Sequence, residues 1–218
     1  MCVQSQPLYY YCNRIPTADE VIDLKFTLYY RGPIGSNKIA HKHAIRRQFH
    51  EQMKELWEQH KGLASLSDLN RKTRHKKVPQ ISSNNRNGDS YNWLYLIGPA
   101  HGISCSLEIT LLKRGAYGKI LRHGGDLDNK LKTLIDALKA PRHKEEHPDG
   151  PPMDDENPYF CVMEDDNFID SIKIKTDRLL ATSASNSEDK PDDVIVLIEV
   201  TTAVYDNDKA DWWQLADH

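Results

Sequence analysis

The sequence predicts an α+β fold built on a mixed β-sheet. Short apolar or alternating segments, typical of strands, occur near both ends and in the middle of the chain. Two longer segments have a helical period, and the order along the chain is strand, helix, strands, helix, strands. With 218 residues, of which 39% are hydrophobic, the chain can bury one sizeable core. We therefore expect a single domain over residues 1–218, with two main helices flanking the sheet.

The first half of the chain contains a strand, a long helix and two further strands. Residues 21–30 alternate apolar and polar side chains, as a strand with one buried face does. Residues 37–61 repeat apolar side chains every three or four positions, which predicts an amphipathic helix. The core face expected for this helix is Ile45, Phe49, Met53, Leu56 and Trp57. Residues 91–98 and 103–114 read as strands.

The second half begins with another amphipathic helix, in the segment GGDLDNKLKTLIDAL of residues 124–138. Its predicted core face is Leu127, Leu131, Leu134, Ile135 and Leu138. Residues 159–176 contain two strand-like halves around an acidic turn, and residues 194–204 read as a buried strand. The core of the domain is therefore expected to span about residues 20–204.

Three segments are too polar or too rich in proline for long regular elements: the basic insertion 67–90, the insertion 141–158 and the acidic tail 205–218.

The charged residues are unevenly distributed along the chain. Residues 1–144 contain 24 Lys and Arg against 12 Asp and Glu, whereas residues 145–218 contain 5 against 20. This asymmetry favours a basic working surface with acidic loops, although clustering on solvated faces explains it equally well.

The composition also suggests a compartment. No stretch approaches the roughly 18 consecutive apolar residues of a membrane span, and residues 1–14 lack the pattern of a signal peptide. The cysteines are scattered, without a C-x-x-C pair, at Cys2, Cys12, Cys105 and Cys161. Such cysteines are usually free thiols in a reducing compartment. We therefore expect a cytoplasmic protein without a membrane partner.

A polar stripe runs beside the core face of the second helix. Asp128, Lys132 and Asp136 are spaced four residues apart, so their directions drift by only about 40° per step. Asp126 stands at the mouth of the helix, after two glycines that permit close approach of backbone or ligand. A helix cap and an ordinary ion pair between Asp128 and Lys132 explain the same residues.

An acidic turn forms the second half of the pattern. Glu164, Asp165 and Asp166 follow an apolar strand-like segment. Three consecutive carboxylates at the end of a buried strand repel one another unless a cation neutralises them, although an exposed acidic turn has no such requirement.

Carboxylates from both segments would suit a divalent cation. Mg²⁺ prefers a few carboxylates together with water and substrate phosphate, which Asp126, Asp128 and Asp166 could accommodate. Two such ions, ~3.5–4 Å apart, can activate water and stabilise the leaving oxygen in phosphodiester hydrolysis. Lys132, one turn along the helix, would offset the charge of the phosphate.

The segments DLDNKLKTLIDAL and EDDNFIDSIKI resemble the two motifs of the RusA-type Holliday junction resolvases, a family of small endodeoxyribonucleases. The resemblance implies catalytic roles for Asp126, Asp128, Lys132 and Asp166. It implies that Asp126, Asp128, Asp165 and Asp166 bind Mg²⁺ and that Mn²⁺ can take its place. It also implies a homodimer that cleaves branched or four-way-junction DNA in recombination and repair. The chain departs from the family in its greater length, its two insertions and its tail.

Basic residues near these motifs are candidates for contacts with DNA phosphates. They are Arg46, Arg47, Lys113, Arg114, Arg122, Lys173 and Lys175. The alternative that these basic residues simply lie on solvated faces explains them nearly as well. His41, His43 and His50 of the first helix are interpreted as surface residues near DNA rather than as a zinc site.

Two alternatives remain open. The chain could be a non-catalytic DNA-binding or protein-interaction module on the same fold, with the acidic loop and the Trp212–Trp213 tail contacting a protein. A Mg²⁺-dependent phosphohydrolase acting on nucleotides would need a base pocket, and the sequence does not indicate one.

Overall fold

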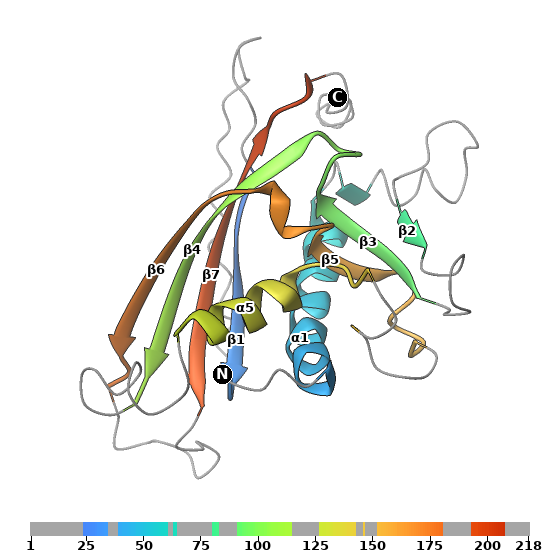
Figure 1. Cartoon of the computed structure of the whole chain (residues 1–218). Coiled ribbons are helices and arrows are strands. Elements are labelled where there is room, and N and C mark those ends of the chain that lie inside the picture. The colour runs from blue at the N-terminus through green and yellow to red at the C-terminus, as the bar shows by residue number, and fades with distance from the viewer. Residues whose placement is uncertain are drawn as a thin grey trace, which may run out of the picture.

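The computed structural model describes residues 24–34, 39–60, 63–64, 80–82, 91–114, 127–142, 146, 152–180 and 193–207. In chain order the elements are β1 (Lys25–Gly32), α1 (Ile39–Gln59), β2 (Gln80–Ser82), β3 (Asn92–Ile97), β4 (Ile103–Lys113), α5 (Leu127–Leu138), β5 (Tyr159–Met163), the 3₁₀ turn η2 (Asp166–Phe168), β6 (Ile169–Arg178) and β7 (Val194–Val204). The fold is α+β, as predicted, and α5 crosses in front of the larger sheet (Figure 1).

The strands form two mixed sheets where the sequence predicted one. The larger has the order β1-β7-β4-β6, and the smaller has the order β2-β3-β5. Strand β4 pairs with β6 in parallel and with β7 in antiparallel fashion, so both of its edges are taken. Strand β3 meets β4 only through the bridge between Gly98 and Ile103, and instead pairs in parallel with β5.

The insertion predicted over residues 67–90 is not wholly a loop, because it contains β2. This short strand pairs in antiparallel fashion with β3. A strand with one free edge offers unpaired N–H and C=O groups, and β2 satisfies part of that edge. The rest of the insertion lies outside the described residues, as does most of the predicted tail 205–218.

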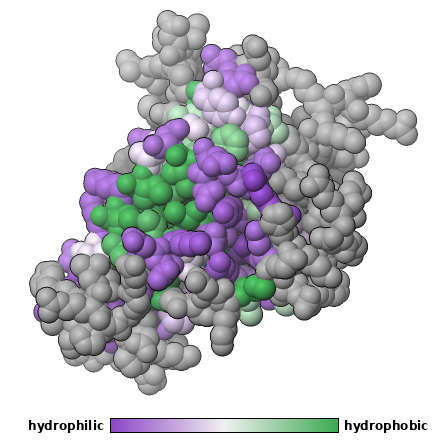
Figure 2. All heavy atoms as spheres, viewed as in Figure 1, coloured by the Kyte–Doolittle hydropathy of each residue, from purple (hydrophilic) through white to green (hydrophobic). Residues whose placement is uncertain are grey.

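The predicted helix faces are largely confirmed. In α1, Ile45, Phe49, Met53 and Trp57 are buried, one turn apart. In α5, Leu134 and Leu138 are fully buried. One hydrophobic cluster takes residues from both helices and both sheets, and a second lies around β3 and β5. Strand β6 is less well covered, and apolar residues remain visible over β4 and β6 beside α5 (Figure 2), in keeping with the 40% exposure of Ile172.

His101 makes folding sensitive to acid. It is buried in the turn between β3 and β4, where its Nδ1 lies 3.0 Å from the Leu96 carbonyl oxygen. Burial lowers its pKa to about 4. Because folding favours the neutral ring, the stabilisation is complete above an unfolded pKa of about 6.5 and is lost as the pH falls to about 4.

We therefore expect the free energy of unfolding to fall by up to about 3 kcal/mol from this group between pH 6.5 and pH 4. Denaturant unfolding measured across that range checks it. His101→Asn keeps a donor near the Nδ1 position but does not titrate, so its profile should be flatter. Parallel profiles for the two proteins would exclude His101 as the source.

Candidate active site

Helix α5 presents a polar stripe beside its buried face. Asp128 and Lys132 are exposed, whereas Asp136 is half-buried. Lys139, one residue beyond the helix, continues the stripe because its direction lies between those of Asp128 and Lys132. The arrangement follows from the helical period, as the sequence predicted.

The acidic turn begins where a fully buried strand ends. All five residues of β5 are buried, and the chain then bends through Asp165 and Asp166 into η2. Asp165 is 5% exposed, and its side chain caps η2 by accepting a hydrogen bond from the Asn167 N–H at 3.1 Å. Asp166 points outward and is exposed. The buried strand and the cap thus fix where the Asp166 carboxylate stands.

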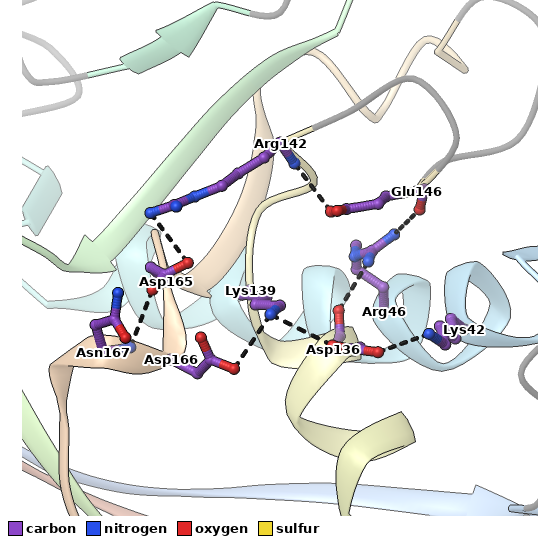
Figure 3. A network of polar contacts seen from close by, with 9 residues as sticks. All are labelled: Lys42, Arg46, Asp136, Lys139, Arg142, Glu146, Asp165, Asp166 and Asn167. Atoms are coloured by element: carbon purple, nitrogen blue, oxygen red, sulfur yellow. Dashed lines mark hydrogen bonds and ion pairs between the residues drawn. The ribbon is translucent and has the colours of Figure 1, made fainter. Parts of the chain in front are cut away.

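The end of α5 and the acidic turn are fastened together. The backbone N–H of Ala140 donates to the carbonyl oxygen of Met163 at 2.9 Å. Lys139 Nζ lies 3.2 Å from Asp166 Oδ2 and 3.4 Å from Asp136 Oδ1, so one ammonium joins carboxylates that are 30 positions apart in sequence (Figure 3). The C-terminal end of the first predicted motif therefore lies against the second.

Each aspartate of the turn has its own cation. Asp166 pairs with Lys139, and Asp165 Oδ2 lies 3.0 Å from Arg142 Nη2 (Figure 3). Partial burial opposes ionisation of Asp166, but the hydrogen bond and charge of Lys139 outweigh it, and the pKa of Asp166 is lowered. The sequence argument held that these acids need a cation. Two side chains of the protein meet that need in this structure.

Asp136 is held from the other side by α1. Lys42 Nζ lies 2.6 Å from Asp136 Oδ2. Lys42, Lys139 and the two carboxylates thus form a row of alternating charge across α1, α5 and η2 (Figure 3). This row places Asp136, to which the motif resemblance gave a supporting role but no metal ligation, next to Asp166.

Asp128 lies at the opposite end of α5 from these contacts. It is eight residues before Asp136, or about 12 Å along the helix axis. One metal ion cannot bind both of those carboxylates directly. Asp126, its predicted partner, lies outside the described residues. The contacts of Asp166 reach α5 at Asp136, through Lys139.

The predicted DNA contact of Arg46 needs correction. Its side chain is buried, and Nη2 donates to the Asp136 carbonyl oxygen at 2.8 Å while Nη1 donates to that of Glu146 at 3.4 Å. The guanidinium also lies over the Trp93 ring, 5.9 Å from its centroid. Burial lowers the pKa of Arg46. This residue anchors the end of α5 and is not available to DNA.

The rest of the basic face of α1 holds the end of the 141–158 insertion. Arg47 lies 3.6 Å from the buried carboxylate of Glu156. His50 is buried rather than at the surface: its Nδ1 accepts from the Phe160 N–H at 2.8 Å, and its Nε2 lies 3.1 Å from the Asp155 carbonyl oxygen. The interpretation of His50 as a surface residue is therefore wrong, because the strand that leads to the acidic turn packs on it.

The remaining predicted DNA contacts lie on β4 and β6, or outside the described residues. Lys173 and Lys175 project from β6 with more than half of each side chain exposed, and both pair with Glu108. Lys113 and Arg114 stand at the end of β4 and are half-buried. Arg122 lies outside the described residues.

The donor chemistry suits a hard cation, but a complete site is not seen. Asp128, Asp136 and Asp166 offer carboxylate oxygens with some exposure, as Mg²⁺ prefers, whereas Cys105 and Cys161 are buried thiols. Among the residues that the structure describes, no three His, Cys, Asp or Glu side chains are grouped closely enough to hold a metal ion. Any ion bound here would complete its shell with water, phosphate or residues beyond the described ranges.

Comparison with known proteins gave no relative: no family model, curated protein or solved structure matches the chain. In the described part of the chain, no helix has the length and apolar character needed to cross a membrane.

Proposed function

We propose that the chain is a Mg²⁺-dependent endodeoxyribonuclease that hydrolyses phosphodiester bonds in branched DNA. The observation that carries the proposal is the attachment of the Asp165–Asp166 turn to the polar stripe of α5. Two acidic segments far apart in sequence thereby meet at the C-terminal end of α5. The motif resemblance to RusA-type resolvases supplies the reaction class.

The proposed metal ligands are Asp126, Asp128 and Asp166, with Asp165 and Asp136 supporting them. Bound Mg²⁺, or Mn²⁺ in its place, would supply an activated water and stabilise charge on the scissile phosphate. The exposed Lys132 would neutralise a non-bridging phosphate oxygen, and Asp165 would hold the turn that presents Asp166.

Contacts with DNA outside the site would come from exposed cations. Lys173 and Lys175 are exposed on β6, which is the edge strand of the larger sheet. Because each contact with a phosphate releases a counterion, such binding weakens as salt rises. We further propose that the protein works in the cytoplasm as a homodimer, in recombination or repair.

The test is cleavage of labelled DNA by the purified chain with Mg²⁺ or Mn²⁺. We expect a four-way junction to be cut with either metal and to stay intact with EDTA, and a linear duplex of the same sequence to be cut much more slowly. Binding of the junction without cleavage under all these conditions would instead favour the non-catalytic module.

A further inference from the structure

One cation holds the two halves of the candidate site together. The Lys139 ammonium lies 3.4 Å from Asp136 Oδ1 and 3.2 Å from Asp166 Oδ2 (Figure 3). The distance between Asp136 Oδ1 and Asp166 Oδ2 is therefore no more than the sum of those two distances. The contact is partly shielded, since the side chains of Lys139 and Asp136 are only 20% and 17% exposed.

The charges around this lysine show what it neutralises. Asp136 has a second cation, Lys42, on its other oxygen. Asp165 is paired with Arg142. Asp166, whose side chain is 45% exposed, has Lys139 as its cation among the described contacts. Loss of the Lys139 charge would therefore affect Asp166 most, since its neighbours keep partners of their own.

We propose that Lys139 is a positioning residue and the protein's own counter-ion for Asp166, the proposed metal ligand that it holds beside Asp136. This inference rests on the proposed function, because it assumes that the site binds a metal with carboxylate ligands. A metal ion that binds Asp166 competes with the Lys139 ammonium for the oxygens of that carboxylate, and the two cations repel each other. The ammonium is therefore displaced from Asp166 when the metal ion binds, while it can keep its contact with Asp136.

The test compares Mn²⁺ binding by calorimetry in the whole metal-free protein and in variants. Lys139→Met and Lys139→Gln remove the charge, and both should bind Mn²⁺ about five- to tenfold more tightly than the unaltered protein. Lys139→Arg keeps the charge and should bind as the unaltered protein does. Lys25→Met removes an exposed lysine from β1, at the opposite edge of the sheet from β6, and should also change nothing.

Thermal unfolding provides a second readout. In EDTA the Lys139→Met protein should melt at a lower temperature than the unaltered protein, and Mn²⁺ should raise its melting temperature more. A purely structural lysine would give the opposite result for binding, because a disturbed site binds metal more weakly.

The outcomes separate the two proposals. If the unaltered protein binds Mn²⁺ and cuts DNA but the charge-removing variants bind no more tightly, Lys139 is not the counter-ion and the proposed function stands. If neither the unaltered protein nor any variant binds Mn²⁺, both proposals fail.

Discussion

Asp128→Asn is expected to abolish cleavage of a four-way junction while leaving DNA binding intact or tighter. The amide is a far weaker ligand for Mg²⁺ than the carboxylate, so the rate should fall by more than about a hundredfold. Binding should not weaken, because one negative charge near the phosphates is removed. Cleavage rates and gel-shift affinities for the same preparations measure both effects.

The exposure of Asp128 makes this variant easy to interpret. An exposed carboxylate in the first turn of a helix interacts with the helix dipole by about 0.3–1 kcal/mol, a loss that is small beside the stability of a folded domain. Asp177→Asn on β6 is a matched control, since it removes the same charge from another exposed position. Normal cleavage by Asp128→Asn would show that the start of α5 takes no part in catalysis.

Arg46→Met should lower the free energy of unfolding by about 3 kcal/mol. The variant keeps the apolar stem but loses two hydrogen bonds, to the carbonyl oxygens of Asp136 and Glu146. Asp136 is in the last turn of α5, where a backbone carbonyl has no hydrogen-bond partner within the helix. A cation at this end of the helix also interacts favourably with the negative end of the helix dipole. Chemical denaturation measures the loss.

Arg47→Met is the matched control for this prediction. Arg47 is the next residue of α1, and its side chain is 35% exposed. Its loss should cost less than that of Arg46, because Arg47 lies 3.6 Å from the buried Glu156 carboxylate, beyond hydrogen-bond length, and Glu156 keeps the hydrogen bond from the Met153 N–H. If instead Arg46→Met folds as stably as the unaltered protein but loses affinity for DNA, the anchoring role assigned here is wrong and the original prediction of a DNA contact is restored.

Local patterns accounted for the parts of the structure that depend on one element. The four-residue spacing of Ile45, Phe49, Met53 and Trp57 predicted the buried face of α1, and that face is buried. The polar stripe of α5 follows from the same period. Lys139 could have been found in the same way, because it stands three residues after Asp136 and continues that stripe.

Contacts between elements could not be predicted in this way. The pairing of Arg142 with Asp165 depends on how the 141–158 insertion returns to the fold, and no local spacing encodes that path. The burial of Arg46 was missed because a basic residue on a helix is usually solvated. Its partners are two backbone carbonyls far away in the chain, and a backbone carbonyl leaves no trace in the sequence.

The most direct measurement of the central claim is the anomalous signal from a crystal of the protein soaked in Mn²⁺. The account predicts Mn²⁺ bound by Asp166 together with at least one carboxylate of the α5 stripe, and loss of that peak in Asp166→Asn crystals. An empty map at these carboxylates, in a crystal whose site faces open solvent and at a Mn²⁺ concentration that supports cleavage, would contradict it.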